Sequence, residues 1–361
     1  MSARAPRRRR VPVRADLVGA EPYGVPQLDV PVRLNTNETP FPPPAAFGDQ
    51  LAKRVASLEL HRYPDRRVWA LRTALGARLG LPPERVWAAN GSNEVLLQLF
   101  QAYGGPGRTL LLCRPGYSAH PLIARVAATD HVEVELDAGL RFSPAAAAAA
   151  VQAHRPDVVC VASPNNPTGI PVSLDTVRAL HDAGDGLVVC DEAYVEFGAA
   201  SAAELLDELP RLVVTRTFSK AFRMAGVRLG YLLAPDWVVD DLRAVRLPYH
   251  LDAMTQEAGT LACELAGEMT AHIEAIVAER ERVRAALAGL DGVDVFDSAA
   301  NFLLFRTRLP AVWEALLDRG VLVRDFSDRP RLAGCLRVTI GTPAENDAFL
   351  TALEDSLHAR P

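Results

Sequence analysis

The chain has 361 residues but almost no lysine: Lys53 and Lys220 are the only two among 39 basic side chains, and the other 37 are arginines. Cysteine is also scarce, with five widely spaced residues and neither a Cys-x-x-Cys pair nor a Cys/His cluster with metal-ligand spacing. We therefore expect no structural metal. Reduced thiols of this kind are typical of a cytoplasmic protein.

Other absences exclude whole classes of function. No apolar run approaches the roughly 18 residues of a membrane span, and the start, MSARAPRRRRVPVR, lacks the apolar segment of a signal peptide. Gly-x-Gly-x-x-Gly and Walker patterns are missing, so a nicotinamide or P-loop site has no support. The first 14 residues hold six arginines and no acid, which leaves −5 − 6 = −11 for the remainder and argues against a nucleic-acid-binding body.

The order of apolar segments indicates the fold class. From about residue 85 to 240, short apolar runs without polar alternation are separated by helical patterns, which indicates a mainly parallel sheet covered on both faces. A long helical pattern then runs from 251 to about 290, and shorter α/β elements follow it. We expect a disordered basic leader (1–12), an N-terminal arm (13–45), a large cofactor-binding domain (46–245) and a small C-terminal domain (246–361).

Polar residues that could take part in catalysis fall where predicted strands end. Parallel sheets bind their ligands at this edge. RTFSK ends one strand with Lys220, and VVCDEAY ends another with Asp191 and Tyr194. Lysine, unlike arginine, can lose its proton and attack a carbonyl to form a Schiff base. Taken singly, each residue also fits a plain role: Lys220 a surface charge, and Asp191 a loop cap or the partner of an arginine.

The same edge offers an anion site. WAANGSNEV joins a strand to a helix through Ser92 and Asn93, and unpaired N–H groups at a helix start attract phosphate, although a simple helix cap is equally compatible. Together the set requires an aldehyde for Lys220, a phosphate for the helix start and Arg228, and a basic ring nitrogen for Asp191. Pyridoxal 5′-phosphate has all three groups.

The chain resembles the fold-type I pyridoxal-phosphate aminotransferases along nearly its whole length after residue 12. The resemblance is carried by RLNTNETPFPPP, LHRYPD, AANGSNEV, PGYSAHP, SPNNPTG, CDEAYVEF, TRTFSKAFRMAGVRLGY, ANFLLF, VLVRDF and CLRVTIGTP. It implies a large domain with a mainly parallel seven-stranded sheet between helices, plus a smaller C-terminal α/β domain. It also implies pyridoxal 5′-phosphate as cofactor and a homodimer with shared active sites.

The resemblance assigns roles to residues at matching positions. The catalytic residues it implies are Lys220, Asp191 and Tyr194, which also contact the cofactor. Further cofactor contacts are implied for Ser92, Asn93, Tyr117, Asn166, Thr217, Ser219 and Arg228, and for Tyr63, which would reach the cofactor of the other subunit. Substrate contacts are implied for Tyr23, Asn37, Arg324 and Arg337.

The activity that the resemblance implies is amino-group transfer between glutamate and histidinol phosphate, a step of histidine synthesis. Three alternatives stay open on the sequence. One is an aminotransferase for aromatic or specialised keto acids, which the pairing of Arg324 with a phosphate-bearing substrate disfavours. The others are a decarboxylase of the threonine-phosphate type and a cofactor-binding regulator without turnover.

Overall fold

The computed structural model describes residues 11–19, 24 and 26–358. Most of the predicted basic leader, residues 1–10, and the predicted substrate residue Tyr23 lie outside the described residues. Among the described helices, none has both the length and the apolar character needed to cross a bilayer.

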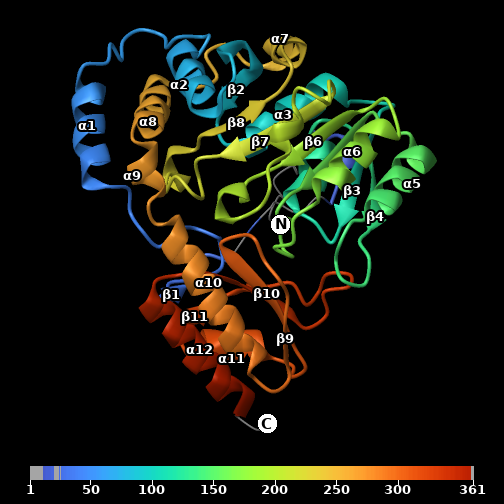
Figure 1. Ribbon diagram of the computed structural model, residues 1–361, viewed down its shortest axis with the longest axis vertical. Helices are drawn as coiled ribbons and strands as arrows, with labels where there is room; N and C mark the ends of the chain where they lie inside the picture. The colour runs from blue at the N-terminus through green and yellow to red at the C-terminus, as the bar shows by residue number, and fades with distance from the viewer. Residues whose placement is uncertain (1–10, 20–23, 25, 359–361) are drawn as a thin grey trace, which may run out of the picture.

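The upper part of the molecule is built on a seven-stranded sheet (Figure 1). Its strand order is β2-β8-β7-β6-β5-β3-β4, and β8 alone runs antiparallel to its neighbours. This confirms the mainly parallel sheet expected from the apolar runs. The strands are β2 (Val86–Ala89), β3 (Thr109–Arg114), β4 (Asp130–Glu135), β5 (Val158–Ala162), β6 (Leu187–Asp191), β7 (Leu212–Thr217) and β8 (Gly230–Leu233).

Helices cover both faces of this sheet, and successive residues of each strand enter opposite layers. In β6, for example, Val189 packs in the cluster with α3, α4 and α7, whereas Val188 packs in the cluster with α2, α5, α6 and α8. Burial on both faces explains why most of the strands have no polar alternation. The edge strand β4, DHVEVE, does alternate, and none of its residues is buried. The helices are α1 (Ala45–Ala56), α2 (Trp69–Leu79), α3 (Ser92–Tyr103), α4 (Ala119–Val126), α5 (Pro144–His154), α6 (Leu174–Asp182), α7 (Asp236–Val245) and α8 (Ala253–Glu264).

The lower part, orange and red in Figure 1, contains a four-stranded antiparallel sheet with the order β12-β13-β10-β9. Its elements are α10 (Ile273–Ala288), β9 (Val293–Val295), β10 (Phe302–Thr307), α11 (Val312–Asp318), β12 (Arg324–Asp325), β13 (Cys335–Thr339) and α12 (Pro343–His358). The N-terminal arm joins this part, because β1 (Val32–Arg33) pairs in parallel with β11 (Val321–Leu322). Single 3-10 turns lie at Ala15–Leu17, Pro83–Arg85, Val195–Phe197, Ala202–Leu205 and Ala225–Val227.

The long helical pattern from 251 to about 290 is not one helix. The chain forms α8, then α9 (Ala266–Thr270), then α10, with interruptions at Leu265 and at His272. Two local features favour the second interruption. The Thr270 hydroxyl donates to the carbonyl of Ala266, and the His272 ring is engaged by Arg223.

Candidate active site

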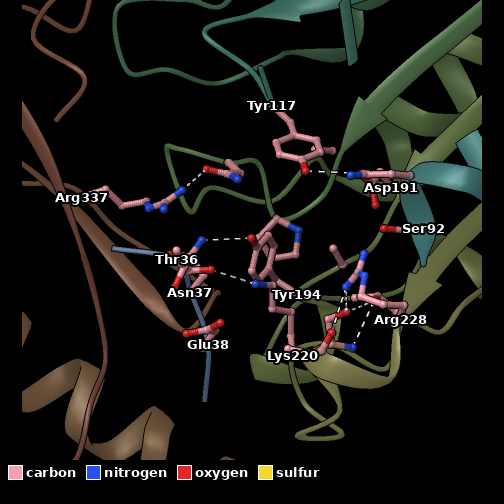
Figure 2. A pocket seen from close by; sticks show the side chains of 18 of the residues that line it. Thr36, Asn37, Glu38, Ser92, Tyr117, Asp191, Tyr194, Lys220, Arg228 and Arg337 are labelled. Atoms are coloured by element: carbon pink, nitrogen blue, oxygen red, sulfur yellow. Dashed lines mark hydrogen bonds between the residues drawn. The ribbon is translucent and has the colours of Figure 1, made fainter. Parts of the chain in front are cut away.

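A pocket of about 370 Å³ lies at the carboxyl ends of β5, β6 and β7, and residues 35–38 of the arm complete its lining. Figure 2 shows its labelled side chains converging on one space, with Arg337 and the arm residues on one side and Asp191, Ser92 and Arg228 on the other. The pocket is lined by Asn35, Thr36, Asn37, Glu38, Ser92, Asn93, Tyr117, Ala162, Pro164, Asn166, Asp191, Ala193, Tyr194, Thr217, Ser219, Lys220, Ala225, Gly226, Arg228 and Arg337.

Lys220 follows β7 and reaches across the pocket to the arm. Its Nζ donates to the carbonyl of Thr36 at 3.0 Å, and it lies 5.8 Å from the ring centre of Tyr194. Burial and then the positive charge of Arg337 lower the pKa of this amine from 10.5 to about 7, although Glu38 opposes the shift. A substantial fraction of the amine is therefore neutral near pH 7, which a nucleophile or general base requires.

Asp191 ends β6 and is 4 % exposed. Its Oδ2 is 3.1 Å from Nε2 of His120 on α4, and its Oδ1 accepts a hydrogen bond from the Thr215 hydroxyl at 3.2 Å. Among the described residues no arginine or lysine pairs with this carboxylate. The carboxylate lines the pocket, where it can accept a hydrogen bond from a protonated group of a ligand.

The arm supplies the wall opposite the sheet. Asn37 adopts a left-handed backbone (φ 55°), and its Nδ2 donates to the hydroxyl of Tyr194 at 3.0 Å. The backbone N–H of Asn37 donates to the hydroxyl of Thr339 at 2.9 Å, and its carbonyl accepts from the amide of Asn301 at 3.1 Å. The small sheet therefore fixes the arm, and the arm orients the phenol of Tyr194.

The start of α3 forms an anion cradle with the segment after β7. The residue before the helix, Gly91, has φ 82°, and no side chain caps the free N–H groups. A Cβ on Gly91 would lie 2.7 Å from Nη2 of Arg228, and one on Gly230 would lie 2.2 Å from the backbone N of Ser92. Arg228 also approaches the Ser219 hydroxyl at 3.4 Å. Gly91 thus leaves space beside the Arg228 guanidinium, and Gly230 lets β8 approach the helix start closely. N–H groups, a hydroxyl and a guanidinium meet there, as the binding of an oxyanion requires.

Arg337, on β13, forms the far end of the pocket. Its Nη1 donates to the side-chain oxygen of Asn166 at 2.5 Å and its Nη2 to the carbonyl of Asn35 at 2.8 Å. The guanidinium also lies 5.2 Å from the ring centre of Phe302 and 5.4 Å from that of Phe326. Its plane is therefore fixed, as bidentate binding of a carboxylate requires.

Most of the site residues expected from the sequence meet in this pocket. Tyr63 and Arg324 do not line it. Tyr63 is 80 % exposed and stacks on Tyr249 at 4.4 Å, and Arg324 lies on β12 beside Arg337, with its Nη2 3.4 Å from the carbonyl of Gly24. The residues brought together are Asn37, Ser92, Asn93, Tyr117, Asn166, Asp191, Tyr194, Thr217, Ser219, Lys220, Arg228 and Arg337.

The sequence did not reveal several contributors. His120 contacts Asp191 and lies edge-on to Tyr117, with ring centres 5.1 Å apart. Its position three residues after Tyr117 in PGYSAHP was the available signal. Thr215 lies two residues before Thr217 in the same strand. Glu38 and the carbonyl of Thr36 belong to the arm, where no periodic pattern marks a functional residue.

Pyridoxal 5′-phosphate fits this donor set. The cradle at α3 matches a phosphate, and Asp191 matches a protonated ring nitrogen because its carboxylate has no arginine or lysine partner among the described residues. The Lys220 amine, with its lowered pKa, matches an aldehyde. Fold and pocket together therefore define a pyridoxal-phosphate enzyme of the α/β aminotransferase type.

The chain belongs to the class I and II aminotransferase family, whose model, "Aminotransferase class I and II", matches residues 30–353. It is 50 % identical over 356 residues to a protein of Mycobacterium marinum named histidinol-phosphate aminotransferase, covering 95 % of this chain and 91 % of that one. The family confirms the fold class, the enzyme class and the cofactor expected from the motifs.

Solved structures are similar across nearly the whole chain. The histidinol-phosphate aminotransferase of Sinorhizobium meliloti, in complex with pyridoxal 5′-phosphate, superposes with a TM-score of 0.85 at 23 % identity, covering 96 % of this chain and 97 % of that one. The L-threonine-O-3-phosphate decarboxylase of Porphyromonas gingivalis superposes with a TM-score of 0.78 at 24 % identity, covering 90 % and 99 %. At these identities the structural similarity establishes the fold. The reaction has to be inferred from the residues of the site.

Proposed function

We propose that this chain transfers the amino group of glutamate to imidazole acetol phosphate, giving 2-oxoglutarate and histidinol phosphate, a step of histidine synthesis. One observation carries the proposal: a single pocket gathers Lys220, Asp191, the cradle at α3 and Arg337. The relative at 50 % identity, named histidinol-phosphate aminotransferase, supports the choice of substrate.

When bound, pyridoxal 5′-phosphate supplies an aldehyde that exchanges for the amino group and a ring that accepts electrons. Lys220 Nζ is the group that takes up and returns the proton of the substrate carbon, because its lowered pKa leaves it partly neutral. Its hydrogen bond to the Thr36 carbonyl holds the amine on the arm side of the pocket. A guanidinium could not replace it, since arginine stays protonated.

The remaining residues bind and orient. Asp191 would hold the proton on the ring nitrogen, and His120 and Thr215 fix the two oxygens of its carboxylate. Tyr194 and Asn166 would contact the ring oxygen, and Tyr117 would lie against the ring. The anion cradle would hold the cofactor phosphate through Ser92, Asn93, Thr217, Ser219 and Arg228.

The substrate side is assigned to the arm and β12–β13. Arg337 would bind the carboxylate of glutamate with its planar fork. Arg324, together with Tyr23 and Asn37, would recognise histidinol phosphate. Arg324 lies beside Arg337 on the neighbouring strand, which supports a second anion site next to the first.

We also propose a cytoplasmic homodimer with shared active sites. The exposed Tyr63, which does not line its own pocket, would reach the phosphate of the partner's cofactor.

Five free thiols suit a reducing compartment such as the cytoplasm. The proposed domain division places the seven-stranded sheet within residues 46–245 and the four-stranded sheet within residues 246–361.

The test is a half-reaction screen of the purified protein loaded with pyridoxal 5′-phosphate. Glutamate, histidinol phosphate, phenylalanine and threonine phosphate are added singly while the cofactor spectrum and released carbon dioxide are followed. Glutamate and histidinol phosphate should each convert the cofactor to its amine form without carbon dioxide. Release of carbon dioxide from threonine phosphate, or conversion by phenylalanine but not by histidinol phosphate, would contradict the proposal.

A variant sharpens the substrate assignment. Arg324→Gln should slow the reaction of histidinol phosphate by about tenfold or more, which is the loss of one charge-assisted hydrogen bond, and should affect glutamate far less. Arg319→Gln is the matched control, because Arg319 is exposed at the end of α11 and its Nη1 donates to the carbonyl of Ala315 in the same helix.

A further inference from the structure

Three residues beyond Lys220, the chain makes a turn that ends in an unusual arginine. Arg223 has a left-handed backbone (φ 59°), a conformation that is unfavourable for a residue with a Cβ. Its N–H donates to the carbonyl of Lys220 at 3.2 Å. The side chains between them, Ala221 and Phe222, are buried. The position of Arg223 is therefore tied to that of Lys220 through the backbone of one turn.

The guanidinium of Arg223 contacts three separate segments. Its Nε donates to Nδ1 of His272 at 2.6 Å, its Nη1 to the carbonyl of Pro42 at 3.0 Å, and its Nη2 more weakly to the carbonyl of Glu268 at 3.5 Å. These acceptors belong to the junction of α10, the N-terminal arm and α9. Arginine suits such a site because its donors are held in a rigid plane, whereas a lysine ammonium would be a single point.

His272 provides a fixed acceptor. It is 7 % exposed, and burial together with the charge of Arg223 lowers its pKa to about 4, so the ring is neutral near pH 7 and Nδ1 can accept. The ring also packs against Phe41 of the arm, with centres 5.7 Å apart in an edge-on arrangement. Two consecutive arm residues, Phe41 and Pro42, are thus held by the pair of Arg223 and His272.

This contact fastens the second end of a segment whose first end is fastened elsewhere. Leu34 bonds through its N–H to the carbonyl of Leu322 at 2.8 Å, and its own carbonyl accepts from Thr339 at 2.8 Å, which attaches the arm to the lower part of the molecule. Between the two ends lie the arm residues that contact Lys220, Tyr194 and Arg337. Proline residues at 40 and 42–44 stiffen the segment, because their φ is fixed.

We propose that Arg223 is a positioning residue that couples the arm, residues 35–42, to the turn of Lys220 and so sets the arm side of the pocket. Without Arg223, the arm is attached only to the small sheet. Its contacts with Lys220 and Tyr194 are then no longer held in place. The consequence for catalysis rests on the proposed function, whereas the consequence for the mobility of the arm does not.

The direct test is hydrogen exchange of the arm amides in Arg223→Gly. Glycine accepts the left-handed backbone, so this variant removes the side-chain contacts without adding strain. The amide of Asn37, which donates to the Thr339 hydroxyl, should exchange about tenfold faster than in the unaltered protein, because the far end of the arm is no longer held. The matched control is Arg155→Gly: Arg155 has φ 44°, is exposed at the end of α5 and has no side-chain hydrogen bond among the described residues. Unchanged arm exchange in Arg223→Gly would overturn the proposal.

Kinetics separate positioning from chemistry. Arg223→Gly should lower kcat/KM for glutamate by about tenfold, with a rise in KM as well as a fall in kcat, because the arm contacts both Arg337, which would bind the substrate, and Lys220, which would move the proton. Arg223→Lys should lie between the variant and the unaltered protein. A loss confined to kcat would contradict a positioning role. If the unaltered protein transaminates neither glutamate nor histidinol phosphate, the proposed function fails, but the exchange comparison still decides the role of Arg223.

A second variant tests the same contact in case Arg223→Gly folds poorly. His272→Phe removes the acceptor and keeps the ring that packs on Phe41. Its arm exchange should accelerate, and the double variant with Arg223→Gly should exchange no faster than Arg223→Gly alone, as expected for two residues that act as one unit. Additive acceleration would show that the two residues act separately and would overturn the coupling.

Discussion

At the residue scale, the proposed chemistry depends on an amine that can be neutral, in a chain whose positive charge comes almost entirely from arginine. Lys220 and Asp191 could be predicted from the sequence because both end apolar strands and one is a lysine among 37 arginines. His120 could not. It lies 71 residues from Asp191, and the pair forms only after α4 packs on the sheet. The acceptor of the Lys220 amine is a backbone carbonyl, which no residue type signals.

The ionisation of Lys220 gives the first prediction. Because its pKa is lowered, the neutral and reactive fraction should rise through about pH 7 instead of near pH 10. Competitive acetylation of the cofactor-free protein between about pH 6 and 10, read by mass spectrometry, should follow this profile, with Lys53 as the internal comparison. Arg337→Gln should move the profile of Lys220 to higher pH, because the charge of Arg337 contributes to the lowering. A profile that rises only above about pH 9 would contradict the account.

At the element scale, the anion cradle arises where a helix start, a strand and a turn approach closely. Most of the seven strands were predictable as apolar runs buried on both faces, whereas the edge strand β4 (DHVEVE) alternates with polar residues and holds no buried residue. The division of the 251–290 pattern into α8, α9 and α10 was not, because one interruption depends on His272 meeting Arg223, a contact far apart in sequence. The anion cradle was predicted in part. The GSNEV segment indicated the helix start, but nothing in the sequence indicated that Gly230 would approach it.

Gly91 gives a prediction at this scale. Gly91→Ala should weaken binding of pyridoxal 5′-phosphate by about tenfold or more, and should lower the free energy of unfolding by about 1–3 kcal/mol, because its backbone conformation suits only glycine and its Cβ would meet Arg228. Fluorescence titration and urea unfolding measure the two effects. Gly48→Ala in α1 is the control. Its Cβ meets nothing within 4 Å, so cofactor binding should not change. Equal affinity in Gly91→Ala would remove the cradle from the site.

At the scale of the whole molecule, the pocket is assembled from both parts of the chain and from the arm. The attachment of the arm through β1 and β11 could not be predicted from the sequence, because a parallel pair of two-residue strands is too short to show an apolar pattern. A second link is Arg331, whose Nη2 donates to the carbonyl of Asp137 at 2.7 Å beyond β4. Tyr63 lies outside its own pocket, is 80 % exposed and stacks on Tyr249.

Subunit mixing tests the shared site. Lys220→Ala should be inactive, and Tyr63→Ala should bind the cofactor more weakly and turn over slowly. In a hybrid of the two, the intact Lys220 of one chain meets the intact Tyr63 of the other, so one site in two should regain unaltered activity. Mixing after mild dissociation, followed by assay at limiting cofactor, measures this. Hybrids no more active than the average of their parents would contradict a shared site.

The central claim is that the amine of Lys220 bonds to the aldehyde of pyridoxal 5′-phosphate while Asp191 holds the opposite end of its ring. The most direct measurement is borohydride reduction of the cofactor-loaded protein, followed by digestion and mass spectrometry. With only two lysines in the chain, the outcome is unambiguous. The account predicts a phosphopyridoxyl group on Lys220 and none on Lys53, with occupancy lost in Asp191→Ala. A label on Lys53, or an unlabelled Lys220 in protein that binds the cofactor, would contradict it.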